Sequence, residues 1–266
     1  VRAMTLNDAH IFCTIDQVKA EFASVMRLVE RAYKTLGITD YAYRLSLRDP
    51  KDTEKYVQND AMWELGERVI REAMTELGLP FYEAEGEAAF YGPKLDIQLR
   101  DVLGREETAS TIQVDFHLPE QFGLEYVAED GSRQRPVIIH RGVISTMERM
   151  TAYLIELYGG AFPAWLAPVQ AVVIPIADRH ADYAYEVLGE LKSAGFRAEA
   201  DARNERMNAK IRDAQLQKVP YMLVVGDRER EARAVAVRTR SGEDLGSMPV
   251  FQFVDRLRDE VATAMD

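Results

Sequence analysis

The sequence predicts two domains, an α+β domain followed by an α/β domain. In the first part, apolar residues at helical spacing mark long helices, while shorter runs between them alternate as strands. Strands of that kind around long helices are typical of an antiparallel or mixed α+β unit. After residue 168, strands and helices alternate with short connections, which predicts a compact and largely parallel α/β sheet.

The elements of the first domain follow from periodicity and from the glycines that end two of the helices. A helix expected over 14–36 stops at Gly37, and another over 60–77 stops at Gly78, because glycine favours the left-handed conformation that ends helices. A further helix is expected from about 145 to 158. Extended segments are expected at 41–47, 89–99, 111–116 and 137–140.

A cluster of glycine and proline separates the two domains. Gly159, Gly160, Pro163 and Pro168 lie within ten residues, and such punctuation is typical of a domain boundary. We therefore expect one domain over 1–163 and a second over 164–266. In the second, strands are expected at 171–176, 197–200, 221–225 and 234–239, and helices at 179–194, 204–217 and from Val250 onward.

The charge of the chain restricts how it could bind nucleic acid. A net charge of −11 argues against a protein that coats nucleic acid indiscriminately, because such binding rests on many cations that neutralise phosphates. The window 197–240 holds eleven Lys and Arg against seven Asp and Glu, a balance of +4 that leaves −15 elsewhere. A nucleic acid is expected to bind in this window. On charge alone, an ordinary solvated surface explains it at least as well.

The composition also indicates where the protein works. No apolar run approaches the length of a membrane span, and the N-terminus lacks the order of a signal peptide. The single cysteine, Cys13, cannot form an internal disulfide, so nothing requires an oxidising compartment. We expect a cytoplasmic protein without membrane association.

Several residues could carry chemistry, although each has an ordinary structural explanation. His10 and His140 lie beside strand-like runs without a metal-binding spacing, so each could equally be a hydrogen-bonded core histidine. Tyr91 and Lys94 flank a Gly-Pro turn, where Lys94 could reach an anion or simply be exposed. Arg149 could bind a phosphate or pair with a neighbouring carboxylate.

Taken together, these segments resemble threonyl-tRNA synthetases, which are class II aminoacyl-tRNA synthetases. The resemblance follows the order and spacing of the motifs and covers essentially the whole chain. The matching segments are NDAHIFC (7–13), AFYGPK (89–94), TIQVDF (111–116), HRGVISTMER (140–149), FPAWLAPVQ (162–170), DARNE (201–205), VPYMLV (219–224), GDRE (226–229) and VAVRTR (235–240).

The resemblance implies a ligase of protein biosynthesis that joins L-threonine to threonine tRNA through threonyl-adenylate, with ATP and magnesium as co-substrate. The fold implied is the C-terminal part of the class II antiparallel-sheet catalytic domain, from the end of motif 2 through motif 3, followed by an α/β anticodon-binding domain. The complete enzyme is expected to be a homodimer. Serine would have to be rejected by an editing domain that is not in this chain.

The resemblance also implies roles for residues of the first domain. His10 and His140 correspond to two of the three protein ligands of a zinc ion whose open positions take the amino group and hydroxyl of threonine. An apolar pocket distinguishes threonine from valine only modestly, because the two side chains have the same shape. A metal that the threonine hydroxyl must coordinate can reject valine, which has a methyl group there. The remaining correspondences are Asp8, Tyr91 and Gln113 in the threonine pocket, Lys94 toward phosphate or carboxylate, and Arg149 of motif 3 on the ATP phosphates.

In the second domain, the resemblance implies residues that read the anticodon. Amide, guanidinium and carboxylate groups can hydrogen-bond the exposed edges of unstacked loop bases. The corresponding residues are Asn204, Arg206, Glu229 and Arg238.

The sequence departs from the family in ways that matter. The third zinc ligand is a cysteine upstream of the region aligned with Val1, and Cys13 is not its counterpart. Motif 1 and the start of motif 2, with its arginine for the α-phosphate, are also absent from this chain. Leu6 stands where a glutamine is common, and Ser145 stands where a glycine is common, a change we expect to be tolerated.

We therefore expect that the isolated chain neither forms threonyl-adenylate nor holds zinc tightly. One alternative is a non-catalytic RNA-binding or regulatory paralogue, which the joint presence of His10, His140, Asp8 and Arg149 disfavours. Another is a class II ligase for a different amino acid such as proline, which the two histidines disfavour. An incomplete antiparallel sheet would also leave an unpaired edge, with a tendency to associate.

Overall fold

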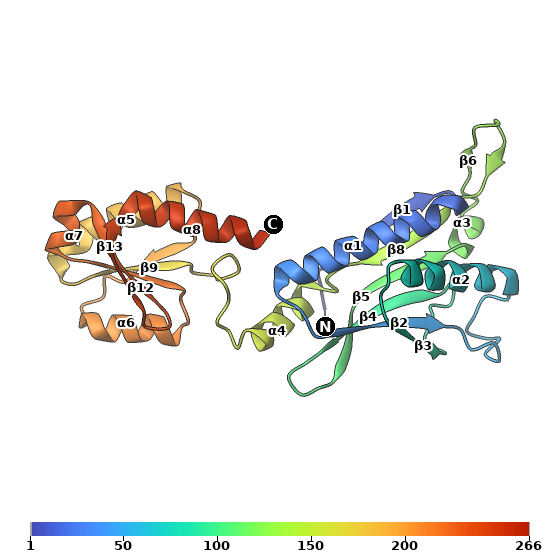
Figure 1. Cartoon of the computed structure of the whole chain (residues 1–266), viewed down its shortest axis with the longest axis horizontal. Coiled ribbons are helices and arrows are strands. Elements are labelled where there is room, and N and C mark those ends of the chain that lie inside the picture. The colour runs from blue at the N-terminus through green and yellow to red at the C-terminus, as the bar shows by residue number, and fades with distance from the viewer. Residues whose placement is uncertain (1, 266) are drawn as a thin grey trace. The chain divides into compact units, whose positions relative to one another are not determined.

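The computed structural model describes residues 2–265 and divides into two compact units, Val1–Leu157 and Tyr158–Asp266. Each unit is built around its own β-sheet, as Figure 1 shows. Among the helices of the described residues, none is long and apolar enough to cross a lipid bilayer.

The first unit is a six-stranded sheet in the order β1-β8-β5-β4-β2-β3. Neighbouring strands are antiparallel except β2 and β3, which are parallel. The strands, in sheet order, are β1 (Ala9–Cys13), β8 (Val137–Gly142), β5 (Glu106–Asp115), β4 (Lys94–Arg100), β2 (Tyr41–Leu47) and β3 (Phe81–Glu85). The α+β class predicted for this part of the chain is confirmed.

Two long helices, α1 (Val18–Leu36) and α2 (Asp60–Glu76), cover one face of this sheet (Figure 1). The apolar stripe of α1, which includes Phe22, Met26 and Tyr33, is fully buried, as its helical spacing predicts. The helix ends at Gly37, whose φ of 70° is the left-handed conformation expected there. Because strand side chains alternate, the opposite face is left for polar residues.

Shorter elements complete the first unit. A 3₁₀ turn, η1 (Ile15–Gln17), precedes α1, and the short helix α3 (His117–Gln121) follows β5. A two-stranded hairpin, β6 (Tyr126–Val127) with β7 (Arg133–Gln134), projects from the sheet in Figure 1. After β8, the helix α4 (Met147–Leu157) ends the unit.

The first unit differs from the prediction at several elements, and two of the differences have a physical reason in the sequence. The extended run expected over 89–99 begins only at Lys94, because Ala89 and Gly92 form a tight turn before it. This turn requires glycine: a Cβ at Gly92 would lie 2.2 Å from the carbonyl oxygen of Val114. The parallel edge strand β3 was not predicted, because its sequence FYEAE has no clear apolar alternation.

The second unit is a five-stranded sheet in the order β10-β9-β11-β12-β13, with helices on both faces (Figure 1). Its strands are β10 (Ala198–Ala200), β9 (Ala171–Pro175), β11 (Tyr221–Val225), β12 (Ala234–Thr239) and β13 (Asp244–Pro249). Its helical elements are η2 (Asp178–His180), α5 (Ala181–Ser193), α6 (Met207–Leu216), α7 (Asp227–Ala232) and α8 (Val250–Met265).

The two faces of this sheet bury separate cores. Residues of α5 and α8, such as Val187 and Phe253, pack with Val173 and Leu223 on one face. On the other face, Ile211 of α6 packs with a second set of strand residues that includes Ile174 and Met222. The central strands β9 and β11 are therefore buried on both sides, which explains their nearly continuous apolar sequences.

The sheet of the second unit is mixed, whereas the sequence predicted a largely parallel one. β10 and β11 are parallel to β9, but β12 is antiparallel to β11, and β13 is antiparallel to β12. The link from Val225 to Ala234 holds only the six-residue helix α7. A crossover to a parallel strand needs a dozen or more residues, so the chain returns antiparallel. The strand β13 was missing from the prediction.

Candidate functional site

The face of the first sheet away from α1 and α2 carries a row of polar side chains. On β4, Leu95 and Ile97 are fully buried, while Lys94 and Asp96 alternate with them and point to the other face. On β5, Gln113 alternates in the same way. The period of two therefore assembles polar groups from neighbouring strands on one surface.

A cleft of about 310 Å³ lies on this surface. Four of the residues predicted from the sequence line it: Asp8, Gln113, His140 and Arg149. They come from the segment before β1, from β5, from β8 and from α4, so the fold brings together groups that are far apart in the chain. The other lining residues are Leu6, Asn7, Thr108, Ala109, Thr111, Arg141, Gly142 and Ser145.

His10 and His140 face each other across the pair β1 and β8. They are direct partners in the strand register, and their ring centroids are 4.7 Å apart in an edge-to-face arrangement. Asp8 lies beside them, with a carboxylate oxygen 3.9 Å from Nε2 of His10. Imidazole nitrogens are common ligands of zinc, and this pair of strands brings two imidazoles together.

The described residues do not complete a metal site. Among residues 2–265, no group of three or more His, Cys, Asp or Glu side chains is arranged to hold a metal ion. Cys13 lies three positions after His10 on β1, so alternation turns it to the other face, where it is buried. This geometry agrees with the expectation that Cys13 is not a ligand.

Tyr91 joins the threonine-pocket residues predicted from the sequence. Its hydroxyl donates a hydrogen bond to Oε1 of Gln113, and its ring lies 5.4 Å from that of His140. Burial, with smaller contributions from the charges of Asp115 and Asp8, raises the pKa of Tyr91 to about 12. Tyr91 therefore remains a neutral hydrogen-bond donor at physiological pH.

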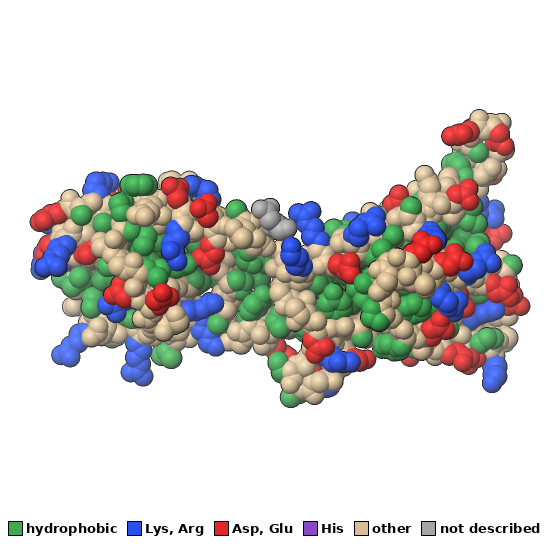
Figure 2. Space-filling view, viewed as in Figure 1, with side chains coloured by type: hydrophobic (Ala, Val, Ile, Leu, Met, Phe, Trp, Pro, Cys, Tyr) green, Lys and Arg blue, Asp and Glu red, His purple; other side chains and the backbone are tan. Residues whose placement is uncertain are grey.

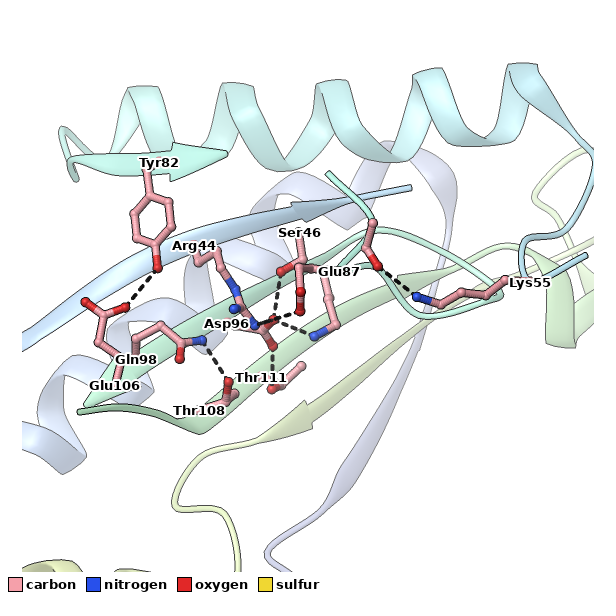
Figure 3. A network of polar contacts seen from close by, with 12 residues as sticks. Arg44, Ser46, Lys55, Tyr82, Glu87, Asp96, Gln98, Glu106, Thr108 and Thr111 are labelled. Atoms are coloured by element: carbon pink, nitrogen blue, oxygen red, sulfur yellow. Dashed lines mark hydrogen bonds and ion pairs between the residues drawn. The ribbon is translucent and has the colours of Figure 1, made fainter. Parts of the chain in front are cut away.

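Lys94 is held by the fully buried carboxylate of Asp96. Asp96 also accepts hydrogen bonds from Arg44 (3.0 Å), Ser46 (2.8 Å) and Thr111 (2.8 Å), as Figure 3 shows. Burial alone would raise the pKa of Asp96, but Lys94, Ser46 and Arg44 outweigh it and keep the pKa below its usual value. The network fixes the position of the Lys94 ammonium.

The sequence left open whether Arg149 binds a phosphate or pairs with a neighbouring carboxylate, and in the structure it forms an ion pair. Its Nη2 lies 2.9 Å from a carboxylate oxygen of Glu107 on β5, and its Nη1 lies 3.4 Å from the hydroxyl oxygen of Ser145. Both charged side chains are more than half exposed, so the pair contributes little to stability. A phosphate in the cleft could therefore take the guanidinium from Glu107 at small cost.

Sequence reasoning missed several residues that shape the site. Asp115 accepts a hydrogen bond from His140, Asp96 anchors Lys94, and Glu107 pairs with Arg149. Asn7 binds the backbone N–H of Val143 at 3.1 Å and so ties the segment before β1 to the end of β8. The only signal was that Asp115 and Asp96 are acidic residues inside strand-like runs, where an unpaired carboxylate would be unfavourable.

The second unit carries the residues predicted to read an anticodon. Asn204 and Arg206 are exposed in the loop that follows β10, and Glu229 lies on α7, which follows β11. Since β10 and β11 are both parallel to β9, these loops emerge at the same edge of the sheet, where ligands of α/β sheets bind. Figure 2 shows basic side chains projecting beside α6.

Arg238 and Glu229 are already engaged in local contacts. Arg238 on β12 pairs with Asp244 on β13 at 3.2 Å, and it lies level with Met222 near the start of β11. Glu229 accepts a hydrogen bond from the backbone N–H of Gly226 at 3.0 Å. Within residues 2–265, no hydrogen bond or ion pair joins any two of the four predicted anticodon readers.

Comparison with known families gives the class of the chain. Residues 1–158 match the tRNA synthetase class II core domain (G, H, P, S and T), and residues 170–260 match the anticodon binding domain. The chain therefore belongs to the class II tRNA synthetases.

Within this class, the chain is similar to threonine-specific enzymes. It is 59% identical over 262 residues to the threonine–tRNA ligase of Anoxybacillus flavithermus, a match that covers 98% of this chain and 41% of the relative. A crystal structure of the RNA binding domain of threonyl-tRNA synthetase from Cryptosporidium parvum shares 35% identity with a TM-score of 0.91, covering 98% of this chain and 64% of that one. A putative threonyl-tRNA synthetase from Aeropyrum pernix shares 26% identity and a TM-score of 0.81, covering 100% and 65%. The chain thus spans about 41% of the length of this curated relative.

Proposed function

We propose that this chain supplies one wall of the active site and the anticodon reader of a threonine–tRNA ligase. That enzyme would join L-threonine to threonine tRNA through threonyl-adenylate, with ATP and magnesium. The observation that supports the proposal most is the cleft that gathers Asp8, Gln113, His140 and Arg149, in a chain 59% identical to a threonine–tRNA ligase. We propose a cytoplasmic enzyme, with domains over 1–163 and 164–266, and a homodimer for the complete protein.

The residues of the cleft have distinct roles in this proposal. Asp8 accepts hydrogen bonds from the bound threonine, and Gln113 and Tyr91 line the pocket beside it. Arg149 leaves Glu107 for the ATP phosphates, where a guanidinium offsets charge that develops as the adenylate forms. Lys94, fixed by Asp96, faces phosphate or carboxylate.

Zinc is part of the proposal, and the chain supplies two of its ligands. The imidazoles of His10 and His140 are adjacent, and the described residues offer no third ligand in place. The two histidines fit the metal, but within residues 2–265 they are the only two ligands brought together for it. When bound, zinc would supply a Lewis acid that distinguishes the hydroxyl of threonine from the methyl group of valine. We therefore expect this chain alone to bind zinc weakly and to form no threonyl-adenylate.

In the second unit, we propose that Asn204, Arg206, Glu229 and Arg238 read bases of the anticodon. Glu229 and Arg238 would exchange their present contacts with Gly226 and Asp244 for contacts with bases. Base edges exposed in a loop accept hydrogen bonds from amide and guanidinium groups and donate them to carboxylates. The local charge balance of +4 in the window 197–240 favours docking of the tRNA backbone there.

The first test is a titration of the chain with threonine tRNA and with the same tRNA altered only in its anticodon, at two salt concentrations. We expect tight binding that is lost when the anticodon changes, because base contacts carry the specificity. Asn204→Ala should weaken binding to the threonine tRNA and leave the altered tRNA unaffected. Asp130→Asn, in an exposed loop of the first unit, serves as the control. Equal and strongly salt-dependent binding to both tRNAs would mean phosphate attraction only and would contradict the proposal.

A further inference from the structure

The His140 imidazole is fixed by a carboxylate that has no role in the function proposed above. Nε2 of His140 lies 2.9 Å from Oδ2 of Asp115, the last residue of β5. The Asp115 side chain is completely buried, and the His140 side chain is 16% exposed. The contact therefore lies behind the cleft wall, where solvent does not compete with it.

Both oxygens of Asp115 are engaged. Oδ1 accepts hydrogen bonds from the backbone N–H groups of His117 at 2.8 Å and of Leu118 at 2.9 Å, at the start of α3. Oδ2 is left for His140. Because an ionised carboxylate can only accept, the proton of a neutral His140 ring must be on Nε2, and the lone pair must be on Nδ1.

Nothing in the described part of the chain uses that lone pair. Among residues 2–265, no hydrogen bond involves Nδ1 of His140. The ring contacts His10 edge-on and lies beside Tyr91, and it forms part of the cleft wall. A histidine that binds a metal commonly donates its other N–H to a carboxylate, which sets the ring orientation and makes the free nitrogen a better ligand.

We propose that Asp115 is a positioning residue that keeps the proton of His140 on Nε2 and presents Nδ1 as the donor atom for a metal ligand site. The inference rests on the proposed function in so far as that function assigns His140 to zinc. The inference does not require the chain to hold zinc, because it concerns which nitrogen of the His140 ring carries the proton before any metal binds. A purely structural role, in which Asp115 only caps α3, would leave the tautomer of His140 unspecified.

The substitution Asp115→Asn separates these two roles. Asparagine has one acceptor oxygen, and the two backbone N–H groups of α3 would keep it. The amide NH2 group would then face Nε2 of His140, where two donors cannot meet. The neutral ring would have to move its proton to Nδ1, and the lone pair would be lost from the side of the cleft.

The test is nitrogen NMR of the whole chain with ¹⁵N-labelled histidine, at about pH 8, above the ordinary histidine pKa of about 6.5. The chain contains only four histidines, and His140→Gln identifies the signals of His140. His180 is an internal reference, because its Nδ1 accepts the N–H of Ala177 and its Nε2 lies 3.0 Å from Asp227. His180 must therefore show the Nε2–H tautomer in every variant.

We expect the Nε2–H tautomer for His140 in the wild-type chain and the Nδ1–H tautomer in Asp115→Asn. The matched control is Asp96→Asn, the same change at another fully buried carboxylate of this sheet, and it should leave His140 as Nε2–H. An Nδ1–H tautomer or a mixture in the wild type would overturn the inference, even if Asp115→Asn fails to fold. An unchanged tautomer in a folded Asp115→Asn would overturn it as well. Neither result bears on tRNA binding, which the anticodon titration tests separately.

Discussion

Single residues of the cleft combine a chemical role with a backbone requirement, and Ser145 is the clearest case. It has φ of 58°, in the left-handed region where a side chain is unfavourable and glycine is not. Its carbonyl accepts the N–H of Asn7, so the strained residue connects the segment before β1 to the start of α4. Glycine, the residue described above as common at this position in the family, adopts this conformation without strain.

Replacing Ser145 by glycine should stabilise the first unit. Relief of the left-handed strain, about 1–2 kcal/mol, exceeds the extra chain entropy of glycine, about 0.5–1 kcal/mol, so a net gain of about 1 kcal/mol or less is expected. The lost contact between the Ser145 hydroxyl and Arg149, at 3.4 Å, is too weak to cancel it. Urea unfolding measures the change. Ser145→Ala keeps the strain and should give no gain; an equal gain in both variants would point to the hydroxyl instead.

Leu6 is the second residue that differs from the family resemblance, and its backbone conformation does not explain the difference. Its side chain is exposed and lines the cleft, but it offers no hydrogen bond where a glutamine is common in the family. The fold tolerates it because the position is on the surface. Because Leu6 lines the cleft, the difference bears on ligand contacts rather than on stability.

Elements of the second unit are joined by charged contacts at the sheet edge where three of the four predicted anticodon readers lie, namely Asn204, Arg206 and Glu229. Asp227, the first residue of α7, accepts a hydrogen bond from Arg179 at 2.7 Å. Its other carboxylate oxygen lies 3.0 Å from Nε2 of the buried His180. Arg179 first, and then His180, hold the pKa of Asp227 well below its usual range. The contact joins η2, after β9, to α7, after β11.

This contact predicts a pH dependence for the second unit. A carboxyl whose pKa is lower in the folded state contributes stability above its unfolded pKa, about 3.9, and loses it as pH falls below that value. Asp227→Asn should therefore lower stability at pH 7 and flatten its fall below about pH 4, so that the two curves converge in acid. The effect should be modest and weaker in salt, because Asp227 is half-exposed.

Urea unfolding at a series of pH values, followed by signals of the second unit, measures this effect. Asp244→Asn is a suitable control, because Asp244 also pairs with an arginine but lies on β13, away from η2 and α7. Parallel pH curves for wild type and Asp227→Asn would contradict the prediction.

At the scale of the whole molecule, the first sheet has an open edge. β1 pairs with β8 on one side and with no other strand of the described residues. Phe12 on this strand is 59% exposed, and Ile15, just after it, is 50% exposed. An unpaired edge with exposed apolar residues is a template for pairing with another chain.

We therefore expect this chain to self-associate in a concentration-dependent way through β1. Phe12→Lys should shift the population toward monomer, because a charge on an edge strand opposes edge-to-edge pairing. Sedimentation velocity over a range of concentrations is the measurement. Phe251→Lys, at an exposed phenylalanine on α8 of the second unit, should have no effect. Monomeric wild-type chain, or the same shift in both variants, would exclude association through β1.

Much of the fold followed from local patterns. The helical spacing of apolar residues such as Phe22, Val25 and Val29 and the stop at Gly37 predicted α1, because periodicity records which face of an element is buried. The resemblance to threonyl-tRNA synthetases named His10, His140, Asp8, Gln113 and Arg149 in advance, and the strand register brings them to one cleft or beside it. Their chemical roles remain predictions.

The tertiary structure decided what depends on partners far apart in the chain. The sequence could not show that Arg149 pairs with Glu107, that Asp115 fixes His140, or that Lys94 shares Asp96 with Arg44. It also predicted a largely parallel second sheet, because alternation of strand and helix does not reveal that the link through α7 is too short for a crossover. Periodicity and motifs are properties of neighbouring residues, whereas hydrogen-bond partners and strand direction are set by long-range register. The sequence alone therefore determined most of the elements, the family and the candidate residues, and the tertiary structure alone determined the remaining strands and what each of those residues contacts.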